Sequence, residues 1–204
     1  NQLLTHYSFH PPSCSGVSSR PEVHSVHLYE PHAGLRILMI DLNVSLLSLD
    51  SPFAQDPLPG DLYLFASRHQ SKSNQHGLLC HTPGNFDADT SAGGQPFRIA
   101  QGSGALSYYL FMHLHAFARQ YDFHVPIDHE VTHHGPTELP VPCAFVEQGS
   151  LPAHWQNATG ARVIAETLIT TAKNMAPLAR STPPWQSSDF TNVVGFGGTH
   201  YMPS

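Results

Sequence analysis

The sequence has 204 residues, of which 40% are hydrophobic, and a formal net charge of −6 with its histidines neutral. This length and composition support one substantial core and favour a single domain. The negative charge excludes a broad basic surface that binds nucleic acid by counterion release alone, but it allows an enzyme that handles one end of an RNA. No segment approaches the roughly 20 apolar residues of a membrane span and no basic-then-apolar leader is evident, so we expect neither insertion nor secretion.

The cysteines and histidines bound the chemistry further. Cys14, Cys80 and Cys143 include no CxxC pair, which favours reduced thiols and a cytosolic protein. The chain has 16 histidines against nine Lys and Arg, and a neutral imidazole is the commonest metal ligand. Residues 1–34 are rich in Pro and Ser, so we predict an irregular segment there with solvated loop histidines. The histidines set aside on this ground are His6, His10, His24, His27 and His32.

Residues 35–204 are predicted to form one α/β domain. Arg36–Ile40 and Leu62–Ala66 are short, mostly apolar runs bounded by turn-rich segments, and this pattern predicts largely buried strands. A third strand is predicted over Leu78–His81, which Pro83-Gly84-Asn85 ends. Candidate functional side chains therefore lie at the ends of strands.

Helical periodicity follows in the second half of the chain. From Ser103 to Tyr121 apolar residues recur at spacings of three and four, which predicts an amphipathic helix with Ser103 as its N-cap. A second helix is predicted over Val163–Met175, closed near Pro177, and Asn192–Gly198 is predicted to be a strand that turns into a glycine loop carrying His200. Strands that alternate with helices indicate a three-layer α/β/α fold.

His129-Glu130-Val131-Thr132-His133 matches HExxH, the zinc-protease motif in which a helix places two histidines on one face. That geometry needs a helix that continues through the motif. Here Pro126 precedes it, two β-branched residues lie inside it and Gly135-Pro136 ends it at once. We therefore predict a strand and reject a metallopeptidase.

On a strand, alternate side chains share a face, so Glu130 and His134 lie on one face and His133 on the other. The two histidines diverge unless the Gly-Pro turn begins early enough to swing His134 round. Glu130 and His134 would be about 13 Å apart, too far to share one ligand. The missing ligands are then expected from elsewhere, with His81 and His200 as the leading candidates because both follow strands beside Gly or Pro.

Two other segments allow two interpretations each. Ser67-Arg68-His69-Gln70-Ser71-Lys72 is either a small phosphate-facing cluster or a solvated polar loop. Gly195-Phe196-Gly197-Gly198 is either a tight strand-to-helix turn or a backbone that approaches a ligand closely.

Taken together, five motifs occur in the order found in a known family. They are Ser67-Arg68-His69-Gln70-Ser71, His81-Thr82-Pro83-Gly84-Asn85, Glu130-Val131-Thr132-His133-His134-Gly135-Pro136-Thr137, Phe145-Val146-Glu147-Gln148-Gly149-Ser150 and Gly195-Phe196-Gly197-Gly198-Thr199-His200-Tyr201. Over residues 36–203 the chain resembles the archaeal and plant type of D-aminoacyl-tRNA deacylase. Five ordered motifs make this resemblance far more specific than any single one.

The resemblance implies a cytosolic, zinc-dependent hydrolase that cleaves the ester between a D-amino acid and the 3′-terminal ribose of tRNA. Its partner would be the 3′ end of aminoacylated tRNA, with neither DNA nor a membrane involved, and its oligomeric state is left open. The implied fold resembles the phosphorylase and peptidyl-tRNA hydrolase class, a mixed sheet between helix layers. The resemblance also implies that this chain lacks family segments at both ends.

The resemblance further implies roles for individual residues. Zinc would be held by imidazoles among His81, His133, His134 and His200 and would lower the pKa of bound water. Glu130 would accept the proton of that water, and Glu147 would be a substitute base or would recognise the substrate's amino group. Arg68 would hold the terminal phosphate or ribose, and the amides of Gly197 and Gly198 would stabilise the oxyanion. The expected substrate-binding residues are Arg68, His69, Asn85, Thr132, Gly197, Gly198 and Tyr201.

Alternatives to this mechanism stay open. The first is a metal-free esterase in which His134 and the substrate's own 2′-hydroxyl perform the acid–base steps. The second is a non-catalytic protein that binds zinc or the tRNA end.

Overall fold

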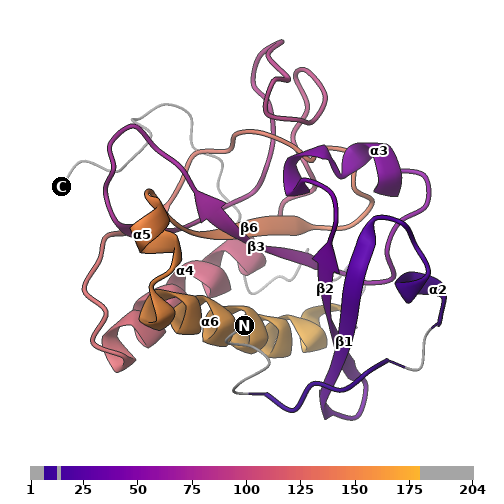
Figure 1. Ribbon diagram of the computed structural model, residues 1–204, viewed down its shortest axis with the longest axis horizontal. Helices are drawn as coiled ribbons and strands as arrows, with labels where there is room; N and C mark the ends of the chain where they lie inside the picture. Colours follow the sequence, from indigo (N-terminus) through magenta and orange to yellow (C-terminus); the bar gives the residue numbers. More distant parts are fainter. Residues whose placement is uncertain (1–6, 13–14, 180–204) are drawn as a thin grey trace.

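The computed structural model describes residues 7–12 and 15–179 (Figure 1). The strand and glycine loop predicted from residue 192 onward, with Gly197, Gly198, His200 and Tyr201, lie outside the described residues, as does Cys14. Cys80 and Cys143 are buried free thiols. Among the described residues, no helix is both long and apolar enough to cross a bilayer.

The N-terminal part forms a two-stranded antiparallel sheet of β1 (Val23–His32) and β2 (Leu35–Leu42). The strand predicted over Arg36–Ile40 is thus confirmed, but the prediction that residues 1–34 are irregular is wrong for β1. Val23, Val26 and Leu28 of β1 are buried. The strand alternates between buried apolar and more exposed polar residues, and its ladder is formed by antiparallel pairing with β2.

The central sheet has four strands in the order β3-β6-β4-β5: β3 (Tyr63–His69), β6 (Cys143–Gly149), β4 (Gly77–His81) and β5 (Ile127–His129). β6 runs parallel to β3 and antiparallel to β4, and β4 runs parallel to β5. The strands predicted at residues 62–66 and 78–81 and the mixed α/β sheet are confirmed. β6, buried along its whole length, was not predicted.

The two long helices are α4 (Gly104–Gln120) and α6 (Ala158–Ala179). Ser103 caps α4 as predicted, since its hydroxyl accepts a hydrogen bond from the amide of Leu106. The second predicted helix is also confirmed, although it begins five residues earlier than Val163 and passes Pro177. Short helical segments complete the described chain: α2 (Ser15–Ser18), η1 (Leu46–Ser48), α3 (Asp50–Phe53) and α5 (Pro152–Trp155).

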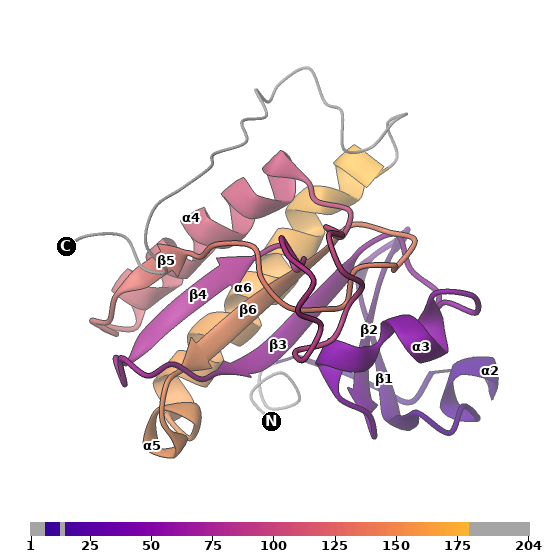
Figure 2. The same ribbon diagram turned by 90° about the horizontal axis from the view of Figure 1, so that it is seen from above.

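The two faces of the central sheet are covered differently (Figures 1 and 2). Both long helices cover one face, where Leu78 and Val146 join their apolar side chains in the main core. Full burial of such aliphatic side chains contributes about 1.5–3 kcal/mol each. Phe65 and Phe145 point to the opposite face, against Leu49 and Phe53 of the η1–α3 region. This second face, covered by short helices and loops, carries the candidate site.

Candidate active site

Strand alternation places chemically active side chains on the face opposite the long helices. Ser67 of β3 pairs in register with Glu147 of β6, and His81 of β4 pairs with Phe145. His69 lies two residues beyond Ser67 on the same face. Three strands from separate parts of the sequence therefore direct polar groups into one buried region.

A cluster of three imidazoles occupies one side of this region. The ring centroids of His81 and His133 are 4.4 Å apart, those of His133 and His134 are also 4.4 Å apart, and those of His81 and His134 are 4.8 Å apart. One ring nitrogen from each histidine lies within 4.8 Å of the others. This spacing matches a three-histidine metal site.

Hydrogen bonds to backbone carbonyls fix how these rings are presented. Nδ1 of His133 lies 2.8 Å from the carbonyl oxygen of Val131, and Nδ1 of His134 lies 2.7 Å from the carbonyl oxygen of Gly135. Nδ1 of His81 lies 3.2 Å from the carbonyl oxygen of Thr82. A carbonyl only accepts, so each Nδ1 carries a proton, and in a neutral ring Nε2 then keeps a lone pair. Metal-binding histidines are commonly oriented in this way.

Burial keeps the two adjacent imidazoles neutral. Desolvation, reinforced by neighbouring His81, lowers the pKa of His133 to about 3 and that of His134 to about 4. His81 is itself 1% exposed, and within the described part of the chain its Nε2 has no hydrogen-bond partner. A buried lone pair without a donor is costly, and a cation at this point would remove that cost.

The chain geometry after β5 differs from the sequence prediction. β5 ends at His129, and residues 130–134 are neither strand nor helix. The rejection of a helical HExxH site therefore holds, but the continuous strand predicted there is wrong. His134 has a φ of +49°, a left-handed conformation that swings its ring towards His133. The two histidines therefore converge, as the sequence allowed for a turn that begins early enough to swing His134 round.

Close backbone packing holds the histidine loop. The Gly84 amide donates to the carbonyl of His134 at 2.7 Å. A Cβ at Gly135 would lie 2.6 Å from both the carbonyl carbon of Gly93 and the oxygen of Leu47, so only glycine fits there. Asp50 accepts hydrogen bonds from the Thr137 amide at 2.9 Å and the Glu138 amide at 2.8 Å. These contacts fix the chain on both sides of His134.

Beside the imidazoles lies a second group of His69, Glu130 and Glu147, all three buried. The two oxygens of Glu147 accept hydrogen bonds from the Ser67 hydroxyl and from Nδ1 of His69, the latter at 3.1 Å. Glu130 Oε2 is 3.8 Å from Nδ1 of His69 and 4.0 Å from Nε2 of His133. The carboxylates therefore border the histidine cluster directly.

The two carboxyl groups have opposite pKa shifts. Burial raises the pKa of Glu130 to about 7, and this exceeds the lowering by the nearby His69 and His81. Burial would also raise the pKa of Glu147, but the hydrogen bonds from His69 and Ser67 and the imidazole of His81, whose Nε2 lies 3.8 Å from Glu147 Oε2, lower it well below its usual range. Near neutral pH, Glu130 therefore exchanges a proton readily whereas Glu147 stays anionic.

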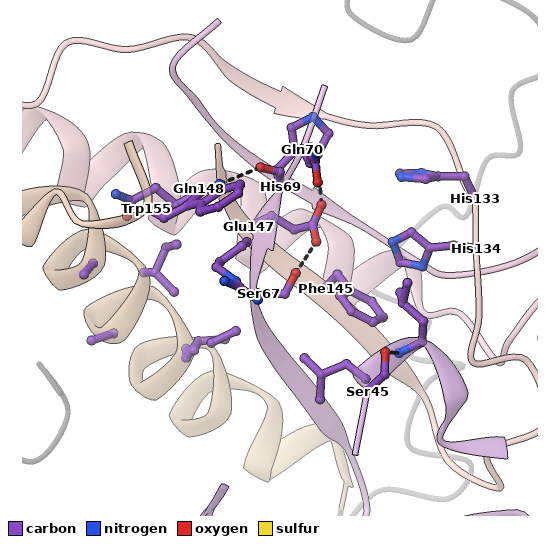
Figure 3. A pocket seen from close by; sticks show the side chains of 18 of the residues that line it. Ser45, Ser67, His69, Gln70, His133, His134, Phe145, Glu147, Gln148 and Trp155 are labelled. Carbon is purple, nitrogen blue, oxygen red and sulfur yellow. Dashed lines mark hydrogen bonds and ion pairs between the residues drawn. The ribbon is translucent and has the colours of Figure 1, made fainter. Parts of the chain in front are cut away.

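Part of this cluster opens into a cavity of about 860 Å³ (Figure 3). His133, His134 and Glu147 line one part of it, and Arg68 and Trp155 line another. The rest of the lining is mostly apolar and comes from the η1 region and from α6: Val44, Leu46, Leu47, Ala161, Ile164, Ala165 and Leu168. The volume falls within the range of small-ligand pockets.

The other predicted site residues have mixed positions. His69 is buried between the carboxylates rather than exposed to a phosphate. Asn85 donates to the carbonyls of Gly93 and Gln95, which gives it a structural role, while the methyl group of Thr132 lies against Gly84. Their substrate-binding roles stay predictions. Sequence reasoning missed Ser67, Asp50 and Trp155, whose partners lie far away along the chain.

The fold and these side chains define an α/β protein with a candidate hydrolytic, metal-competent centre. Residues 58–204 match the family model of D-aminoacyl-tRNA deacylase, and the chain belongs to this family.

Two curated proteins and one solved structure are similar to this chain. The D-aminoacyl-tRNA deacylase of Methanococcus maripaludis strain C7 is 32% identical over 162 residues, covering 76% of this chain and 59% of the relative. That of Methanosarcina acetivorans is 31% identical over 161 residues, covering 79% of this chain and 50% of the relative. A crystal structure described as a conserved protein of unknown function superposes with a TM-score of 0.72 at 27% identity, covering 99% of this chain and 64% of that one. The chain thus spans 50% to 59% of the length of these two curated relatives.

Proposed function

We propose that the protein hydrolyses the ester between a D-amino acid and the 3′-terminal ribose of tRNA in the cytosol. The observation that carries the proposal is the convergence of one ring nitrogen from each of His81, His133 and His134 beside two carboxylates of opposite protonation behaviour. The family membership of the chain supports the substrate class. Fold alone would not assign this activity.

The three imidazoles fit zinc. Neutral His nitrogens are preferred zinc ligands, and catalytic sites commonly use three protein ligands and leave a fourth position open. Zinc bound there would polarise the ester carbonyl and lower the pKa of a water molecule. The candidate ligands in the described chain are His81, His133 and His134, and His200 stays a fourth candidate from the sequence.

The two carboxyl groups are suited to different roles, Glu130 to proton transfer and Glu147 to substrate binding. Glu130, with its pKa near 7, is suited to accept a proton from water and return it to the leaving ribose oxygen. Glu147 stays anionic and is suited to pair with the substrate's α-ammonium group. His69 holds Glu147 by a hydrogen bond and faces Glu130, so it keeps the two groups in place. Environments that separate two carboxyl pKa values are typical of acid–base pairs.

The test is deacylation of matched D- and L-aminoacyl-tRNA, with and without a chelator. We expect the D-ester to be hydrolysed faster, the chelator to abolish turnover, and added zinc to restore it. Equal rates on the two enantiomers would defeat the proposed function. Chelator-resistant turnover would instead favour the metal-free reaction by His134 and the substrate's 2′-hydroxyl, and binding without turnover would favour a non-catalytic role.

A further inference from the structure

Trp155 and Arg68 lie in contact in the cavity wall and form a surface that the hydrolytic chemistry leaves unused. The guanidinium carbon of Arg68, on β3, lies 5.1 Å from the centroid of the Trp155 ring, at the end of α5. Both side chains line the same cavity as His133, His134 and Glu147. A guanidinium in cation–π contact with an indole offers a cationic and apolar surface.

The edge of the Trp155 ring is tied to the catalytic region. Its Nε1 donates a hydrogen bond of 2.7 Å to the carbonyl of His69, whose imidazole contacts Glu147 (Figure 3). The one polar atom of the indole is therefore already satisfied, and what the side chain offers to the cavity is its faces. Arg68 directly precedes His69 in β3, and its side chain points to the other face of the strand from those of Ser67 and His69.

Arg68 is exposed, and no carboxylate lies within ion-pair distance of it among the residues that the structure describes. Ala161 and Ala165 of α6 line the same cavity with small side chains and so leave its width open to a ligand. Gln148, next to this surface, is held by the carbonyls of His154 and Asn157. The walls are fixed while the surface between them is free to receive a planar group.

We propose that Arg68 and Trp155 form a stacking platform for an unpaired nucleobase, the terminal base of the tRNA whose ester lies at the histidine–carboxylate centre. This inference rests on the proposed function. Proteins recognise single-stranded RNA ends by stacking bases on aromatic rings and Arg planes. A terminal nucleotide carries its ester on the ribose next to the base, so a platform beside the centre suits that base.

The first experiment needs no turnover. In a Trp185→Phe background, where Trp155 is the remaining tryptophan of the sequence, adenosine is titrated while indole fluorescence is recorded. We expect saturable quenching by adenosine and by an oligonucleotide that ends in CCA and carries no esterified amino acid. The oligonucleotide should displace adenosine. Arg68→Ala should weaken adenosine binding by about tenfold, the typical contribution of a base stack.

Controls separate the base from other ligands. Arg36→Ala removes an exposed arginine on β2 and should leave quenching unchanged. Ribose 5-phosphate should not quench, and if it binds as well as adenosine, Arg68 reads a phosphate and the platform is wrong. Adenosine that quenches without being displaced by the CCA oligonucleotide marks a separate nucleotide site and also overturns the proposal.

The second experiment measures hydrolysis of D-aminoacyl-tRNA. Arg68→Ala keeps the Trp155–His69 hydrogen bond and should raise KM about tenfold while kcat stays nearly unchanged. The reason is that the base would stack equally well in the ground state and in the transition state, so its loss weakens substrate binding and not the chemical step. Trp155→Phe, which keeps an aromatic face, should raise KM less than Trp155→Leu. A fall in kcat with constant KM for Arg68→Ala would contradict the platform. Absence of all turnover with intact quenching would defeat only the proposed function.

Discussion

The imidazoles of His81 and His133 stack with their centroids 4.4 Å apart and their planes 24° from parallel, although the chain separates them by 52 residues. His81 ends β4, whereas His133 lies in the loop that follows β5. Parallel pairing of β4 with β5 brings the two segments together. Two imidazoles stacked in a buried site lose solvation, and a shared cation would offset that loss.

His133→Ala is expected to abolish zinc binding and D-aminoacyl-tRNA hydrolysis. It removes one of three converging ring nitrogens, and the loss in activity should exceed the roughly 10–100-fold that removal of an outer partner costs. Metal content of the purified protein and kcat/KM give the two measurements. The control is His124→Ala, whose side chain is 80% exposed. Full zinc occupancy in the His133 variant would contradict the ligand assignment.

Glu130→Gln is expected to stabilise the metal-free protein. Because the folded-state pKa of Glu130 is raised from 4.5 to about 7, the native state binds more protons than the unfolded state between these values, and stability falls as pH rises through this window. Above pH 7 the ionised Glu130 lowers the free energy of unfolding of the wild-type protein by at most about 3 kcal/mol.

This difference is measured by urea unfolding in a chelator between pH 4 and pH 8. The variant and wild type should have similar stability near pH 4 and diverge up to pH 7, while activity of the variant is lost. Exposed Glu30→Gln on β1 is the matched control, for which no such pH-dependent divergence is expected. A Glu130 variant that follows the wild-type curve at every pH refutes the burial argument.

Gly135→Ala is expected to destabilise the fold and to displace His134. The added methyl group would lie 2.6 Å from the Gly93 carbonyl carbon and the Leu47 oxygen, both backbone atoms that do not yield easily. Overpacking of this kind costs about 1–3 kcal/mol or more. Urea unfolding and zinc content are the measurements, and Gly16→Ala, with nothing within 4 Å of the new methyl, is the control. Equal stability of the two variants would show that the loop is looser than described.

Asp50→Asn is expected to loosen the chain after the histidines. Its carboxylate accepts the amides of Thr137 and Glu138 and the Thr137 hydroxyl, and hydrogen bonds to charged groups contribute about 1.5–3 kcal/mol each. An asparagine keeps only one acceptor oxygen and turns an NH₂ towards the remaining donors. We expect a loss of about 2–3 kcal/mol in the free energy of unfolding and weaker zinc binding. Asp41→Asn, at an exposed site with one contact to Ser25, should change neither quantity.

The sequence by itself determined part of the local structure and the chemical inventory. The spacing of apolar residues predicted α4 with its Ser103 cap and the core of α6, and short apolar runs predicted β2, β3 and β4. Pro and Gly around the HExxH match excluded a helix there. The motifs identified the family, and they identified His81, His133, His134, Glu130 and Glu147 as candidates. These properties follow from residue type and short-range periodicity.

Only the tertiary structure decided how those side chains converge. The left-handed turn at His134 reverses the divergence that strand alternation predicts, and it depends on packing of Gly135 against residues 93 and 94. The Ser67–Glu147 hydrogen bond joins residues 80 positions apart, through the register of β3 with β6. Trp155 reaches His69 across 86 positions. Such contacts arise from long-range pairing and exclusion of water, which no local pattern encodes.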